Sequence, residues 1–115
     1  MGKISLTVPK GKDYIGVLRL TASSVANCYK FSLDEIEDIK ISIAEAAILY
    51  IGSDVEEDLT TSFDFIDGEL TIEMTISQPS DDSLSLQIIT ALMDEARFVD
   101  DILLMKKCLK ENANG

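Results

Sequence analysis

One carboxylate in this sequence stands among apolar residues, where a side chain able to do chemistry is easily noticed. Glu45 lies in the segment 43–51, which is otherwise nearly all apolar. It continues a polar helical face formed by Asp38 and Ser42, yet Leu49, one turn further on, belongs to the same face. A leucine at the end of a polar stripe indicates that another element or a partner covers this surface, or that side chains fill a pocket there.

The rest of the sequence carries no independent catalytic signature. It lacks a glycine-rich phosphate loop and a calcium-loop motif, and it contains no histidine. The lack of histidine removes His-based acid–base catalysis and His-containing metal sites. The acidic runs at 56–58 and 100–101 are typical of a solvated loop and a turn. We therefore expect no metal site and no cofactor.

Bulk composition narrows the class of protein. The chain has 115 residues, 46% of them hydrophobic, and 10 basic against 21 acidic side chains give a net charge of −11. We expect one folded domain over residues 1–110 and a disordered tail over 111–115. The acidity argues against direct binding of nucleic acid or anionic membranes, although it also serves solubility. No membrane-length apolar run and no signal peptide are present, which favours a cytoplasmic protein.

Hydrophobic periodicity predicts the elements that position Glu45. Alternation over residues 4–8 predicts a strand that Pro9 ends, and residues 13–28 follow a helical period. Ser32 followed three residues later by Glu35 is a capping box, which predicts a second helix that runs to about Gly52. Glu45 then lies in the last third of this second helix.

The pattern of the second half of the chain predicts mainly strands. Asp67-Gly68 between the strand patterns 61–66 and 69–77 predicts a tight hairpin. Residues 83–93 predict a third helix with Leu84, Ile88, Ile89 and Leu92 facing inward, and 96–99 and 102–109 predict a last strand pair. The order β-α-α-β-β-α-β-β indicates an α+β two-layer sandwich, with a mostly antiparallel five-stranded sheet and three helices on one face.

Several segments resemble the anti-sigma-factor serine kinases, a family of the GHKL, or Bergerat-fold, ATPases. The resemblance is carried by DYIGVLRLT at 13–21, DEIEDIKI at 34–41, the Glu45-Ala46 pair and ALMDEAR at 91–97. It covers nearly the whole chain in the family's order. The element order predicted from periodicity agrees with the minimal Bergerat fold that this resemblance implies.

The resemblance also shows which nucleotide-site residues differ. In that family a glutamate acts as the base, and an asparagine four residues later holds Mg²⁺. Glu45 matches the glutamate, but Leu49 stands at the asparagine position and has no oxygen for a hard cation. Glu45 is the only motif residue that is retained.

Two further motifs of the family's ATP site are replaced. Ile76 and Gln78 stand where an Asp-x-Gly motif reads adenine, and Ser83 and Ser85 stand where Gly-x-Gly cradles phosphate. The connection 79–82 is too short for the family's lid. These vestigial positions predict a degenerate member without ATP cofactor or catalytic residues, which is therefore not an enzyme.

The expected function is that of a regulatory protein-binding module in sigma-factor control of bacterial transcription. The resemblance implies a partner that is a sigma factor, an anti-anti-sigma antagonist or a related kinase subunit, and a possible homodimer. The outward face of the first helix, with Val17, Arg19 and Ser23, is the candidate contact surface. Two alternatives remain: a residual ATP-dependent serine/threonine kinase, and a sensor that binds a small ligand in the vestigial nucleotide pocket.

Overall fold

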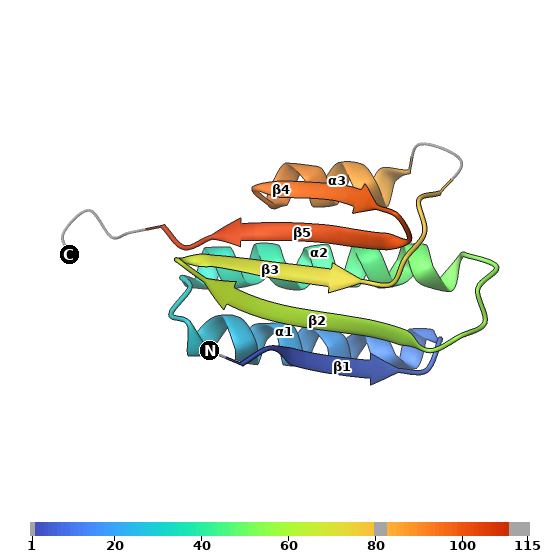
Figure 1. Ribbon diagram of the computed structural model, residues 1–115, viewed down its shortest axis with the longest axis horizontal. Helices are drawn as coiled ribbons and strands as arrows, with labels where there is room; N and C mark the ends of the chain where they lie inside the picture. Colours follow the sequence, from blue (N-terminus) through green and yellow to red (C-terminus); the bar gives the residue numbers. More distant parts are fainter. Residues whose placement is uncertain (1, 80–82, 111–115) are drawn as a thin grey trace.

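Five strands pair into one antiparallel sheet, in the order β1-β2-β3-β5-β4 (Figure 1). The computed structural model describes residues 2–79 and 83–110, so the predicted tail at 111–115 lies outside the described residues. The strands are β1 (Ile4–Val8), β2 (Leu59–Ile66), β3 (Glu69–Met74), β4 (Glu95–Val99) and β5 (Ile102–Cys108).

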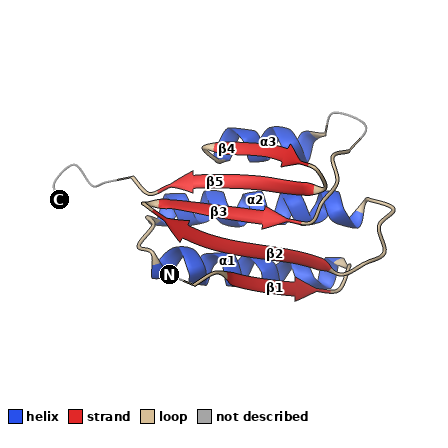
Figure 2. Ribbon diagram, viewed as in Figure 1, coloured by secondary structure: helices blue, strands red, loops and turns tan. Residues whose placement is uncertain are grey.

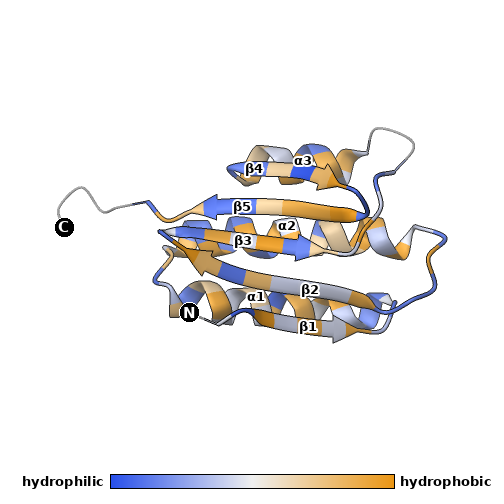
Figure 3. Ribbon diagram, in the orientation of Figure 1, coloured by the Kyte–Doolittle hydropathy of each residue, from blue (hydrophilic) through white to orange (hydrophobic). Residues whose placement is uncertain are grey.

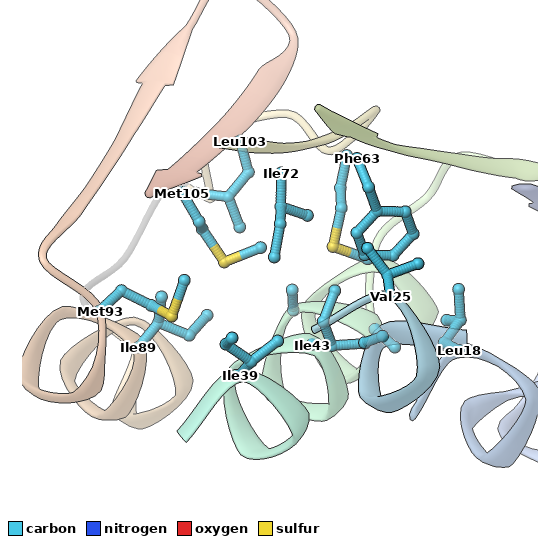
Figure 4. Close-up of a cluster of buried hydrophobic side chains, with 14 of the residues drawn as sticks. Leu18, Val25, Ile39, Ile43, Phe63, Ile72, Ile89, Met93, Leu103 and Met105 are labelled. Atoms are coloured by element: carbon cyan, nitrogen blue, oxygen red, sulfur yellow. The ribbon is translucent and has the colours of Figure 1, made fainter. Parts of the chain in front are cut away.

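Three α-helices cover one face of this sheet and leave the other face open (Figure 2). They are α1 (Ile15–Cys28), preceded by the short 3-10 turn η1 (Lys12–Tyr14), then α2 (Leu33–Ile51) and α3 (Leu84–Leu92). In the helical layer α2 packs against α1 on one side and α3 on the other (Figure 4). The predicted two-layer α+β sandwich and its element order are confirmed.

The capping box that was predicted at the start of α2 is present. Ser32 Oγ accepts a hydrogen bond from the Glu35 amide, and Glu35 Oε1 accepts one from the Ser32 amide. The Lys110 amide also donates to Glu35 Oε2 at 3.2 Å, so the end of the described chain is tied to the start of α2. This arrangement fixes where α2 begins and therefore the rotation of all its side chains.

The core lies between the sheet and the helical layer. Phe63 of β2 stands opposite Ile72 of β3, which stands opposite Met105 of β5, and all three point toward the helices (Figure 4). Ile43 of α2 and Leu18 of α1 are also fully buried. Along β3 the buried Leu70, Ile72 and Met74 alternate with Thr71 and Glu73, which lie on the open face, and Figure 3 shows this alternation of hydropathy along β3.

The Asp67-Gly68 turn has the predicted conformation, since φ is 52° at Asp67 and 77° at Gly68. Two details differ from the prediction. The ladder of β3 ends at Met74 instead of at residue 77, because the Ile76 amide donates to the Met74 carbonyl. Leu84, predicted to face inward, is 71% exposed. No helix among the described residues is long and apolar enough to span a membrane.

Candidate functional site

The structure brings Glu45 and Ser85 together. Glu45 lies on the side of α2 that faces α3, and its Oε1 accepts a hydrogen bond from Ser85 Oγ at 2.8 Å. Both residues are half-buried. The carboxylate is therefore directed into the α2–α3 interface and is bound there by a hydroxyl of the same chain.

Ser83 completes this end of α3. It is the N-cap residue, with φ −121° and ψ 146°, and its Oγ accepts a hydrogen bond from the Leu86 amide at 3.0 Å. Ser83 thus satisfies a backbone donor that a bound anion at a helix N-terminus would otherwise use. The two serines that were predicted to replace glycines make different contacts: Ser83 caps α3, and Ser85 binds Glu45 of α2.

Ile76 is part of the core. It is 2% exposed and packs in the main hydrophobic cluster, although it follows the last ladder residue of β3. An aliphatic side chain at this position contributes packing and offers no hydrogen-bond acceptor. Among the six positions that were predicted to be vestigial, Ile76 has the clearest structural role.

Leu49 and Gln78 share a groove of about 460 Å³ at the C-terminal end of α2. Leu49 is half-buried against the core, and Gln78 is exposed. The groove is lined by Ile48, Leu49, Gly52, Ser53, Asp54, Val55, Ser77, Gln78 and Pro79. The site is thus divided: Glu45, Ser83 and Ser85 meet at α3, whereas Leu49 and Gln78 line the groove.

The loop that follows α2 forms one wall of this groove and is held in place. Lys10 Nζ donates to the carbonyls of Ser53 at 2.6 Å and of Val55 at 2.7 Å. The Tyr50 hydroxyl donates to the Glu57 carbonyl, and burial, followed by the charge of Glu57, raises the pKa of Tyr50. Tyr50 therefore stays protonated and keeps donating at neutral pH.

A second groove, of about 270 Å³, lies between α1 and α2 and is lined by Gly16, Arg19, Leu20, Ser23 and Lys40. It contains Arg19 and Ser23 of the predicted contact surface, while Val17 lies on the same helix and is 43% exposed. The prediction missed Leu20, which is 72% exposed. Its signal was an apolar side chain off the core face of the helical pattern.

Within residues 2–79 and 83–110, no three His, Cys, Asp or Glu side chains gather in a way that could hold a metal ion. The chemistry that the site offers is hydrogen bonding by one carboxylate, two hydroxyls and an exposed amide, beside apolar surface.

The fold has a clear counterpart among solved structures. A crystal structure of the RsbU and RsbW domains of a Mycobacterium tuberculosis protein matches 98% of this chain with a TM-score of 0.78 and 15% identity. The chain spans about a third of that protein, 34% of its length. The fold is therefore the GHKL type found in an RsbW domain.

Sequence comparison is more specific. The serine-protein kinase RsbW of Bacillus subtilis is 31% identical over 121 positions, covering 82% of this chain and 76% of the relative. The RsbW of Halalkalibacterium halodurans is 30% identical and covers 95% and 85%; that of Bacillus thuringiensis is 28% identical and covers 86% and 78%. No family model matches the chain. The chain belongs to the RsbW serine-protein kinase family.

These relatives correct one prediction. The sequence was interpreted as that of a protein that is not an enzyme, but the similar proteins are named serine-protein kinases, and this contradicts the interpretation.

The residues that were predicted to stand at the family's nucleotide positions do not fit Mg-ATP. Leu49 offers no oxygen ligand, Ile76 is a buried aliphatic, and the Ser83 hydroxyl already engages the first turn of α3.

Proposed function

We propose that this chain controls a bacterial sigma factor by binding a protein partner, and that the outward face of α1 makes the contact. Membership of the RsbW family supports the regulatory role. The contact surface is inferred from one observation: Leu20, which lines the groove between α1 and α2, is 72% exposed. The partner is a sigma factor, an anti-anti-sigma antagonist or a related kinase subunit.

The chemistry of this surface defines what it binds. Leu20 and Val17 expose apolar area on adjacent turns of α1, and such area is typical of a protein contact. Arg19 and Lys40 are the charged residues of the groove, although the chain as a whole has a net charge of −11. Lys40 Nζ also lies 3.4 Å from Glu37. The surface suits an apolar side chain with an acidic neighbour.

Capture from the source cells tests this proposal. The tagged chain is used as bait beside two variants of the same length, Leu20→Asp in the groove and Leu84→Asp at the start of α3. Leu84 is 71% exposed, against 72% for Leu20, and it does not line the groove, which makes it a matched control. We expect the wild type and Leu84→Asp to recover a sigma factor or an antagonist, and Leu20→Asp to lose it. Equal recovery by all three excludes the α1 surface.

Serine kinase activity is a second candidate function, favoured by the names of the relatives and by Glu45, which stands at the position predicted for the family's base. The test is transfer of labelled phosphate from ATP to the captured antagonist, with Glu45→Gln as the matched variant. Transfer that the wild type performs and Glu45→Gln does not supports this candidate. Equal transfer by both, or none by either, argues against a role of Glu45 in chemistry.

The proposal includes pairing of two copies through the open face of the sheet. Val99 of β4 is 40% exposed there, and Ile102 and Leu104 of β5 are half-buried on the same face. Light scattering reports the mass in solution. We expect a dimer for the wild type and a monomer for Leu104→Glu; a wild-type monomer contradicts this part.

A further inference from the structure

Helix α3 is anchored less firmly than its neighbours. Of its nine residues only Ile89 is fully buried, whereas α2 buries eight residues. Leu84, at its start, is 71% exposed. A helix of this length is not stable without tertiary contacts. The contacts at its two ends therefore decide how often α3 leaves its place.

The C-terminal end of α3 is fixed to the sheet. The Leu92 carbonyl accepts a hydrogen bond from Lys107 Nζ at 2.6 Å, and Met93 is 6% exposed in the core beside Ile89 (Figure 4). The Asp94 amide then donates to the Lys106 carbonyl at 2.9 Å, where β4 begins. This end can act as a pivot but cannot leave without disturbing the sheet.

The N-terminal end depends on one side-chain contact. Among the described residues, the hydrogen bond from Ser85 Oγ to Glu45 Oε1 is the one side-chain bond that joins the first half of α3 to another element. The Ser83 bond to Leu86 stays within α3 and does not resist opening. Apart from its packing against α2, the N-terminal half of α3 is thus held by a single side-chain hydrogen bond to another element among the described residues, which we call the clasp.

A buried hydroxyl on the same face of α2 favours opening. Ser42 of α2 is 0% exposed, and its Oγ has no hydrogen-bond partner among the described residues. It lies one turn after Asp38 and one turn before Glu45, on the helical face that contacts Lys107 and Ser85. A buried hydroxyl without a partner is costly, and this cost disappears when water reaches it.

We propose that α3 is a hinged cover over the Asp38–Ser42–Glu45 face of α2, pivoting near Met93 and held shut by the Ser85–Glu45 clasp. Opening frees the Glu45 carboxylate to accept a hydrogen bond from another donor. It also hydrates Ser42. The cover is a property of the fold and is independent of which partner binds α1.

Hydrogen exchange of the full chain, measured by mass spectrometry, tests this proposal. Ser85→Ala removes the clasp, and Thr90→Ala on the exposed side of the same helix is the matched control. Loss of a hydrogen bond to a charged acceptor predicts roughly tenfold faster exchange of the α3 amides in Ser85→Ala. Exchange in α2 and β3 stays unchanged, and Thr90→Ala behaves like the wild type.

Ser42→Ala gives a second and opposite expectation. In Ser42→Ala, opening of α3 no longer relieves the cost of a buried hydroxyl without a partner. Opening is therefore less favourable, and exchange of the α3 amides slows by about fivefold. Faster exchange in Ser85→Ala confined to α3, together with slower exchange in Ser42→Ala, supports the cover. Equal exchange of Ser85→Ala and Thr90→Ala overturns it, as does exchange in which α3 opens only together with α2 and the sheet.

Discussion

The contact between Lys107 and Asp38 predicts an asymmetry that can be measured. Lys107 Nζ lies 3.1 Å from Asp38 Oδ2 and 2.6 Å from the Leu92 carbonyl oxygen. The Lys107 side chain is only 6% exposed, whereas that of Asp38 is 34% exposed. Removing Asp38 leaves a buried ammonium with one carbonyl, while removing Lys107 leaves a carboxylate that water reaches.

The magnitudes follow from this difference. Asp38→Ala is expected to lower the free energy of unfolding by about 3 kcal/mol, the lower end of the range for breaking a buried pair. Lys107→Met keeps most of the apolar stem, so its expected cost is about 1 kcal/mol, chiefly from the unpaired Leu92 carbonyl. The double variant should cost about 1 kcal/mol, because the buried charge is then gone.

Urea denaturation followed by circular dichroism measures these values. Lys106→Met is the control, since Lys106 is the adjacent strand residue and lies 3.5 Å from Glu69 on the open face of the sheet. Such a partly exposed pair contributes less than about 1 kcal/mol. The reasoning is refuted if Lys107→Met costs as much as Asp38→Ala, or if the costs of the single variants simply add.

Three further outcomes follow from local geometry. Gly68→Ala places a side chain at φ 77° and should cost about 1 to 2 kcal/mol in the same assay; no change would contradict a turn in the left-handed region. Ser32→Ala removes the cap of α2 and should cost about 1 kcal/mol, and a neutral result would argue against the capping box. Burial acts to raise the pKa of Glu35, but hydrogen bonds from the Ser32 and Lys110 amides outweigh it and hold the pKa below 4.5. Because the folded pKa is lowered, this carboxylate stabilises the fold above pH 4.5, and the contribution is lost as the pH falls through the folded pKa. Glu35→Gln should lack this part of the acid dependence, and an unchanged profile would show that Glu35 does not titrate with unfolding.

Much of the fold was predictable because its signals are local. The Ser32 to Glu35 capping box and the Asp67-Gly68 turn each act over four residues or fewer, and both formed as predicted. The alternating strand over residues 4–8 also has the predicted bounds. Local sequence determines these features since the groups that satisfy one another are close along the chain.

Features that depend on distant contacts were not predictable. The alternation of apolar and polar residues in β3 continues through Ile76, so the sequence indicates a longer strand. The hydrogen-bonded ladder stops at Met74, although the Ile76 side chain is buried. Leu84 fits the helical period, yet the contacts of Ser85 and Ile89 turn α3 so that Leu84 faces outward.

In the candidate site, too, local features were predictable and contacts between distant residues were not. Glu45 was singled out from the sequence because a carboxylate in an apolar run is a local signal. Its bond to Ser85 joins residues 40 positions apart, and the Lys107–Asp38 contact joins residues 69 positions apart. Neither pairing is encoded in the spacing of residues along one element.

Binding of a purified sigma factor, identified by capture, tests the central proposal most directly. Calorimetric titrations compare the wild type with Leu20→Asp and with the control Leu84→Asp, which changes the same residue type at a 71% exposed position outside the groove. Loss of a central apolar contact typically costs 2 kcal/mol or more, so we expect the Kd of Leu20→Asp to rise by roughly 30-fold. The Kd of Leu84→Asp should match the wild type. Equal affinities for all three proteins would contradict a partner-binding surface on α1.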